Sequence, residues 1–309
     1  MPIKLIAAPH TPLDPTGKLA PMVIADQARY LKQSGVAGVF VGGSTGEYAS
    51  LTVAERMTLA ETWIQHGHSA GLQVIVQVGH NCQIDAIQLA DHANGIGADA
   101  ISSLAPGYFK PNSASELVHF LTPIAAAAPQ TPFYFYDIPV MTGVNVSTVD
   151  VLRLASELLP NLAGIKYTNP DLIQFQECLR YDQGRYEIWF GCDEALLAGY
   201  ALGARGAVGS TYNFAAPLYH SMIDCYENGD HEQARKLQSD SIALIRICQS
   251  FGYMAAAKAV MSFLGVDCGP VRPPLMPLNE IQLAKLREKV LGLDSLRALM
   301  DISAAETRA

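Results

Sequence analysis

Short apolar runs alternate along the chain with longer segments whose apolar positions recur at helical spacing. The runs show little strict alternation with polar residues, which is typical of strands buried on both faces. We predict eight strands, at residues 4–9, 37–43, 72–79, 98–104, 132–138, 162–168, 186–192 and 203–210. Parallel strands need crossover helices, and the segments between the runs can supply them.

Capping patterns mark where some of these helices begin. Thr52 with Glu55, and Ser113 with Glu116, have the spacing of a capping box, in which each side chain hydrogen-bonds the other residue's backbone N–H. Each pair therefore predicts a helix that starts directly after it.

Eight strand and helix units in one series favour an α/β fold of the (β/α)8 TIM barrel type, with an open sheet as the alternative. We assign residues 1–215 to the barrel core. We assign residues 216–309 to a C-terminal helical region that includes the last barrel helix. Amphipathic segments predict its helices near residues 217–228, 230–250, 253–264 and 279–291.

Composition narrows the classes of function. The 309 residues are 50% hydrophobic and 16% charged, with no run long enough to cross a bilayer, so we expect no membrane partner. The net charge of −8 without a Lys/Arg cluster argues against nucleic-acid binding. The start, "MPIKLIAAPHTPLD", lacks the pattern of a secretory signal, and we expect a cytoplasmic protein. Six cysteines without a CxxC pair do not suggest a disulfide framework or a zinc ribbon.

A lysine ends the sixth predicted strand, in the stretch "LAGIKYTNPDL". Asn169 and Pro170 read as an N-cap and first helical residue, which places Lys166 just before a strand-to-helix turn. One interpretation is a lysine that reaches the surface at a strand end. The other is a nucleophile, because an amine in an apolar wall has a lowered pKa and can form an imine with a 2-oxo acid.

Hydroxyl groups follow several other strands at the same predicted end of the barrel, where barrel enzymes place their reacting groups. Tyr136 ends the neighbouring strand, and Ser44, Thr45 and Tyr108 follow strands two and four. Taken singly, these are ordinary barrel aromatics and turn residues. Together with Lys166 they can form a proton relay, because hydroxyl groups both donate and accept hydrogen bonds.

The loop "GGSTGE" matches neither GxxxxGK[ST] nor GxGxxG, so we do not predict nucleotide binding there. Its backbone N–H groups and the hydroxyls of Ser44 and Thr45 suit a carboxylate. Glu47 is a capping or structural acid as readily as a functional one. Asp193 and Glu194 open a helix, where the helix dipole favours acids, and can also hydrogen-bond a polyol. With no HExxH motif, we expect neither a metal site nor a cofactor.

Four motifs, "GGSTGE", "YDIPVMTG", "GIKYT" and "GSTYN", occur in an order and spacing that resemble the class I pyruvate-dependent aldolases. This family includes N-acetylneuraminate lyase and dihydrodipicolinate synthase. The resemblance implies a (β/α)8 barrel with a C-terminal helical extension, assembled as a homotetramer. It also implies that Lys166 forms the imine with pyruvate, Tyr136 transfers the proton, and Ser44 and Thr45 bind the pyruvate carboxylate. Tyr108 matches a tyrosine that reaches into the neighbouring subunit's site.

Within the family, residues 191–213 are similar to the branch that cleaves N-acetylneuraminate to N-acetylmannosamine and pyruvate by a retro-aldol reaction. The resemblance implies sugar-binding roles at five positions, Thr168, Gly191, Asp193, Glu194 and Ser210.

Two sequence features bear on the branch and its chemistry. The synthases typically carry an arginine after the tyrosine motif, and "YDIPVMTG" has none. Asp137 stands where the family commonly has Asn. Lyases or dehydratases for other 2-keto-3-deoxy sugar acids, a synthase-like condensation, a metal-dependent aldolase and a non-catalytic acid-binding barrel are the alternatives.

Overall fold

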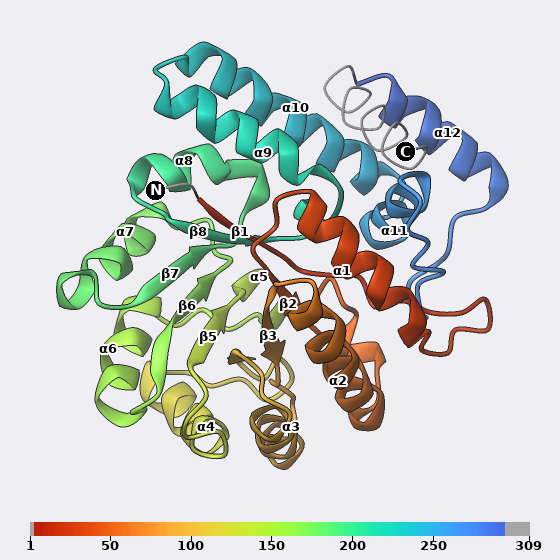
Figure 1. Cartoon of the computed structure of the whole chain (residues 1–309). Helices are drawn as coiled ribbons and strands as arrows, with labels where there is room; N and C mark the ends of the chain where they lie inside the picture. The colour runs from red at the N-terminus through yellow and green to blue at the C-terminus, as the bar shows by residue number, and fades with distance from the viewer. Residues whose placement is uncertain (1–2, 294–309) are drawn as a thin grey trace.

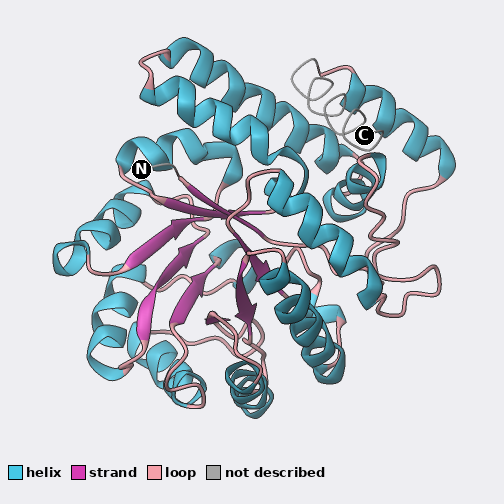
Figure 2. Ribbon diagram, viewed as in Figure 1, coloured by secondary structure: helices cyan, strands magenta, loops and turns pink. Residues whose placement is uncertain are grey.

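The computed structural model describes residues 3–293. Eight parallel strands close into a barrel in which each strand pairs with the next and β8 pairs with β1. Helices surround this barrel in Figures 1 and 2. The (β/α)8 prediction and its eight strands are confirmed. The strands are β1 Lys4–Ala7, β2 Gly38–Val41, β3 Gln73–Gln77, β4 Ala100–Leu104, β5 Phe133–Asp137, β6 Leu162–Tyr167, β7 Glu187–Phe190 and β8 Gly206–Gly209.

The helices divide into an outer ring and a C-terminal extension. The ring contains α1 Ile24–Gln33, α2 Val53–Ser69, α3 Gln83–Gly95, α4 Ala114–Ala126, α6 Thr148–Leu158, α7 Leu172–Arg180, α8 Leu196–Leu202 and α9 Tyr212–Glu227. A short helix, α5 Pro139–Thr142, lies in the loop after β5. The extension contains α10 His231–Ser250, α11 Tyr253–Phe263 and α12 Glu280–Leu291. None of the helices within residues 3–293 has the length and hydropathy needed to span a membrane.

Both faces of the sheet are buried, as the continuous apolar runs predict. Outward-facing strand residues pack against the helices in a large core. A second core fills the barrel interior, where the rings of Tyr134 and Trp189 stack with centroids 3.8 Å apart. Because side chains alternate along each strand, Tyr134 and Tyr136 both point inward, and Tyr136 lies nearer the carboxyl end.

Capping chemistry explains two helix starts. Thr52 and Glu55 form the predicted capping box at α2. Ser113 accepts a hydrogen bond from the Glu116 N–H at α4, but the Glu116 carboxylate accepts from the Asn112 N–H instead of closing the box. The second pair therefore makes one of the two hydrogen bonds predicted for a capping box.

The predicted start of α7 is wrong. The N-cap is Asp171, whose carboxylate accepts hydrogen bonds from the N–H groups of Ile173 and Gln174. Asn169 instead accepts the Asp171 N–H and donates to Asp137. The tertiary contact with β5 holds Asn169 outside the helix, so Pro170 lies in the loop that precedes it.

The C-terminal helices match the amphipathic segments, with one shifted boundary. α9 begins at Tyr212, before the predicted residue 217, and bends at Ala215, where the backbone leaves helical geometry (φ −135°). Pro217 follows this bend, so its missing N–H falls where the helical hydrogen bonding is already interrupted. α9 and α10 lie side by side in Figure 1. The predicted helical region extends to residue 309, and its last 16 residues, 294–309, lie outside the described part.

We predict that Asp171→Ala lowers the free energy of unfolding by about 1 kcal/mol, because two N–H groups at the start of α7 lose their acceptor. Urea unfolding followed by circular dichroism measures the change. Pro170→Ala is the matched control, and we expect a smaller effect from it. An equal or larger loss of unfolding free energy in Pro170→Ala would indicate that Pro170, and not Asp171, stabilises the start of α7.

Candidate active site

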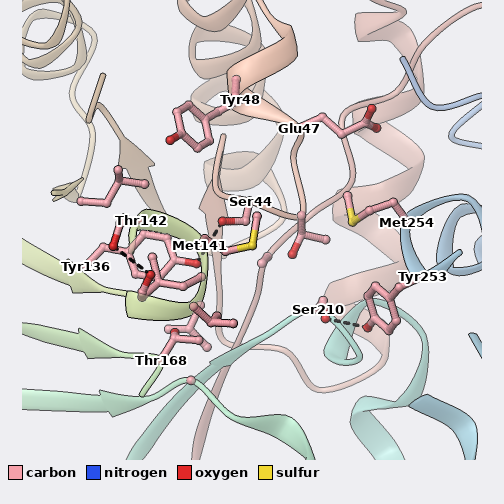
Figure 3. Close-up of a pocket in the computed structure, with 18 of the residues that line it drawn as sticks. Ser44, Glu47, Tyr48, Tyr136, Met141, Thr142, Thr168, Ser210, Tyr253 and Met254 are labelled. Carbon is pink, nitrogen blue, oxygen red and sulfur yellow. Dashed lines mark hydrogen bonds between the residues drawn. The ribbon is translucent and has the colours of Figure 1, made fainter. Parts of the chain in front are cut away.

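A cavity of about 710 Å³ opens at the carboxyl ends of the strands. Loops from around the barrel line it, and residues of α10 and α11 line one side. Tyr253 and Met254 of α11 are labelled in Figure 3. The ten residues singled out from the sequence all line this one cavity: Ser44, Thr45, Tyr108, Tyr136, Lys166, Thr168, Gly191, Asp193, Glu194 and Ser210. The structure therefore brings together every residue of the predicted site.

Lys166 lies on β6 with its side chain inside the barrel, and the residue is only 4% exposed. Its Nζ is 3.8 Å from the ring centroid of Phe40 and 3.9 Å from that of Tyr136. Burial lowers the pKa of Lys166 from 10.5 to about 7, and the negative charge of Asp193 opposes that shift. A large fraction of the amine is therefore uncharged near neutral pH, which is the form that attacks a carbonyl carbon. The interpretation of Lys166 as a surface lysine is wrong.

Tyr136 is the paired neighbour of Lys166 across the β5 and β6 strands. Its hydroxyl lies 3.4 Å from Ser44 Oγ, and the two point toward each other in Figure 3. Burial raises the pKa of Tyr136, and the contact with Ser44 opposes this shift. Tyr136 is therefore a neutral phenol beside the amine when the cavity holds no substrate.

The loop of residues 42–47 supplies donors at the cavity wall. Its turn is closed by a hydrogen bond from the Glu47 N–H to the Ser44 carbonyl oxygen. Within residues 3–293, the backbone N–H groups of Ser44 and Thr45 have no acceptor. Two N–H groups and two hydroxyl groups in one turn at a cavity wall are donors of the kind that bind a small carboxylate.

Thr168 and Gly191 lie in close contact where β6 and β7 end. A Cβ atom at position 191 would overlap Thr168 Oγ1, so only glycine fits there. Thr168 Oγ1 is buried and has no hydrogen-bond partner among the described residues. A buried hydroxyl without a partner at a cavity wall is suited to a ligand hydroxyl or carbonyl group.

Asp193 is buried beneath the cavity, while its neighbour Glu194 is exposed at the wall. The Asp193 carboxylate accepts hydrogen bonds from the N–H and the hydroxyl of Thr211, at 2.8 and 2.6 Å. It packs so closely on Gly209 that any side chain there would collide with it. Burial raises the pKa of Asp193 to about 6, and the Thr211 hydrogen bonds oppose the shift.

Ser210 and Tyr253 connect the barrel to the C-terminal extension. Their hydroxyl oxygens lie 2.6 Å apart, with Ser210 after β8 and Tyr253 at the first position of α11 (Figure 3). The C-terminal helices thus contribute directly to the cavity wall.

Tyr108 lies at the mouth and is 77% exposed. Asn81 holds its loop by accepting hydrogen bonds from the N–H groups of Gly107 and Tyr108. The neighbouring Phe109 is 85% exposed and packs edge-on against the Tyr108 ring.

Asp137 does not line the cavity, although it follows Tyr136 directly. Its side chain points outward and accepts hydrogen bonds from Thr148 and Asn169, and burial raises its pKa. Asp137 therefore joins the loops after β5 and β6 and does not contact the Tyr136 relay.

Sequence reasoning missed the part of the wall that comes from distant segments. Seven of the further lining residues are Tyr48, Asn81, Ile245, Gln249, Tyr253, Met254 and Leu275. Of these seven, only Tyr48 and Asn81 follow predicted strands and were open to the strand-end argument. The others come from the C-terminal region, where no local motif marks them.

The charges of the cavity wall are unequal. Among the described lining residues, Lys166 is the only basic side chain, whereas Glu47, Asp193 and Glu194 are acids. Residues 3–293 contain no group of three or more His, Cys, Asp or Glu side chains arranged to hold a metal ion. The wall offers one amine, several hydroxyl groups and the donors of the turn of residues 42–47.

A parallel barrel that buries a lysine of lowered pKa beside a phenol, in a cavity at its carboxyl end, defines a class of enzymes that act through an imine on lysine. A family model described as the dihydrodipicolinate synthetase family matches residues 1–291. The chain belongs to this family. The resemblance seen in the four motifs is thereby confirmed.

Relatives of known identity cover nearly the whole chain. N-acetylneuraminate lyase of Danio rerio is 40% identical over 290 residues, which cover 93% of this chain and 94% of the relative. The solved structure of Proteus mirabilis N-acetylneuraminate lyase matches with a TM-score of 0.93 and 39% identity, covering 95% and 99% of the two chains. A structure described as a catalytic lysine mutant of Ruminococcus gnavus sialic acid aldolase matches with a TM-score of 0.88 and 28% identity, covering 98% and 97%.

The lowered pKa of Lys166 predicts a pH-dependent stability. The folded protein binds the Lys166 proton less tightly than the unfolded chain does. Protonation of Lys166 therefore lowers the free energy of unfolding. This loss grows as pH falls from 10.5 to about 7 and is constant below pH 7. We expect Lys166→Met to unfold at higher urea concentration than the unmodified protein, with a larger difference at pH 7 than at pH 10. A difference independent of pH over this range would contradict the assigned pKa.

Proposed function

We propose that this chain is an imine-forming lyase that cleaves N-acetylneuraminate to N-acetylmannosamine and pyruvate. The observation that carries the proposal is the buried amine of Lys166, whose pKa is lowered to about 7, in contact with the ring of Tyr136. The names of its relatives from Danio rerio and Proteus mirabilis support the choice of substrate.

In the proposed cycle, the Lys166 amine attacks the keto carbon of the substrate. The carbinolamine loses its hydroxyl as water when the Tyr136 phenol donates a proton, which leaves an iminium ion beside a phenolate. The positive iminium stabilises the phenolate, so the raised pKa of Tyr136 in the empty cavity is no obstacle to this step. Tyr136 therefore begins the cycle as an acid.

The phenolate of Tyr136 then removes the proton of the C4 hydroxyl group. The C3–C4 bond breaks, its electron pair moves toward the iminium to form an enamine, and C4 leaves as the aldehyde carbon of N-acetylmannosamine. Tyr136, again a phenol, returns the proton to C3. Water then hydrolyses the resulting iminium, which releases pyruvate, restores the Lys166 amine and returns one proton to the Tyr136 phenolate.

The wall composition supports a substrate with one carboxylate and several hydroxyl groups. We assign the carboxylate to Ser44 and Thr45, and the sugar hydroxyls to the region of Thr168, Gly191, Asp193, Glu194 and Ser210. A second carboxylate would lie near acidic side chains, because the described lining residues include no basic side chain besides Lys166. Values of kcat/KM over a panel of 2-keto-3-deoxy sugar acids would rank the substrates.

We predict that Lys166→Ala abolishes cleavage of N-acetylneuraminate, and that Tyr136→Phe lowers kcat by about 10²- to 10⁴-fold while the apparent affinity changes little. A coupled assay for pyruvate measures both, with circular dichroism to establish that each variant is folded. Substantial turnover by folded Lys166→Ala would refute the imine mechanism. A change confined to KM in Tyr136→Phe would make Tyr136 a substrate-binding residue.

We further propose a cytoplasmic homotetramer in which Tyr108 reaches toward a neighbouring subunit's site. Two exposed apolar residues, Val140 (82% exposed) and Met141 (68%), line the cavity, and Phe109 (85%) packs against the lining residue Tyr108. Exposed apolar side chains of this kind suit a subunit contact. We expect Phe109→Asp to dissociate the tetramer in multi-angle light scattering, while Ile84→Asp, on α3, does not. A tetramer unchanged by Phe109→Asp would exclude this contact.

A further inference from the structure

A buried ion pair lies behind the carboxylate-binding loop. Lys258 Nζ on α11 is 3.0 Å from a carboxylate oxygen of Glu47, and both side chains are 2% exposed. Glu47 is the last residue of the loop of residues 42–47, so the pair joins this loop to the C-terminal extension.

The stability of the fold does not by itself explain such a pair. Removing two charges from water is costly, and apolar side chains of similar volume are often as stabilising as a buried ion pair. Burial lowers the pKa of Lys258, and the charge of Glu47 opposes that shift. A buried pair does, however, favour one arrangement of the segments that carry it, because breaking it leaves an uncompensated charge.

Both members of the pair have further partners that fix their position. Lys258 Nζ also donates a hydrogen bond of 2.7 Å to the Pro270 carbonyl oxygen. The second carboxylate oxygen of Glu47 accepts the backbone N–H of Arg272 at 2.9 Å. The adjacent His10 is neutral, because burial lowers its pKa to about 3, so it adds no positive charge beside Lys258.

The backbone of Glu47 depends on support from outside the loop. Its φ of 54° and ψ of 34° lie in the left-handed region, which is unfavourable for a residue with a side chain. In this conformation its N–H closes the turn on the Ser44 carbonyl oxygen. The turn that contains Ser44 and Thr45 therefore ends at Glu47, the residue that is paired with Lys258.

The same helix also contributes to the cavity. Met254 lines the cavity and stands four residues before Lys258, so the two share one face of α11. One face of α11 thus carries both Met254, which lines the cavity, and Lys258, which holds the loop of residues 42–47.

We propose that Glu47 and Lys258 are a positioning pair that fixes the loop of residues 42–47 and thereby sets the affinity of the site for the 2-oxo acid carboxylate. This inference rests on the proposed function, in which Ser44 and Thr45 bind that carboxylate. Neither member of the pair is assigned a contact with the substrate.

Isothermal titration with pyruvate tests the proposal, because pyruvate carries the carboxylate and the keto group without the sugar. The variants are Glu47→Gln, Lys258→Met and the double variant. We expect each single variant to bind pyruvate roughly three- to tenfold more weakly. The double variant should bind no more weakly than the weaker single variant, because both changes remove one and the same interaction.

Leu121→Ala, in the fully buried outer core on α4, is the matched control for lost stability. It should lower the melting temperature and leave pyruvate affinity unchanged. Unchanged affinity in folded Glu47→Gln and Lys258→Met, or losses that multiply in the double variant, would overturn the proposal.

Two further outcomes are informative. If the single variants do not fold, the double variant tests the proposal, because it leaves no unpaired buried charge. Weaker pyruvate binding by the double variant would then support the positioning pair, and unchanged binding would overturn it. If the unmodified protein does not bind pyruvate, the proposed function itself fails. That result differs from a failure of this inference alone, in which the unmodified protein binds pyruvate and the variants bind it equally well.

Discussion

The removal of one amine from water is the constraint on which the site depends. Lys166 reaches into the barrel interior over the rings of Phe40 and Tyr136, and this burial lowers its pKa to about 7. The parallel barrel makes this possible, because inward-facing residues near the strand ends are surrounded by other strands yet open onto the cavity. The same burial keeps Tyr136 protonated, so a phenol that can donate a proton lies beside an amine that can lose one, as the proposed cycle requires.

Close backbone contacts allow the cavity to hold polar groups without filling with side chains. Glycines at positions 191 and 209 let Thr168 and Asp193 lie against neighbouring strands. The C-terminal extension then closes the cavity from one side, with Tyr253 bonded to Ser210. The barrel brings Lys166 and Tyr136 together, and the helices after β8 complete the wall of the cavity.

The eight strands could be predicted from the sequence because strands buried on both faces appear as continuous apolar runs. The sequence predicted the ten cavity residues because parallel strands deliver their ends to one place and because the motifs resembled a family. It did not predict Tyr253 or Met254, which reach the cavity through packing between distant segments. The misplaced start of α7 has a similar cause, since a bond from Asn169 to Asp137 overrides a local capping pattern.

Trapping of the imine tests the central claim most directly. The protein is incubated with pyruvate and borohydride, and the reduced adduct is located by peptide mass spectrometry. The account predicts a single adduct on Lys166, with the solvent-exposed Lys236 as an internal control that stays unmodified. Absence of an adduct on Lys166 in folded protein, or adducts on surface lysines alone, would contradict the claim that the buried amine is the nucleophile.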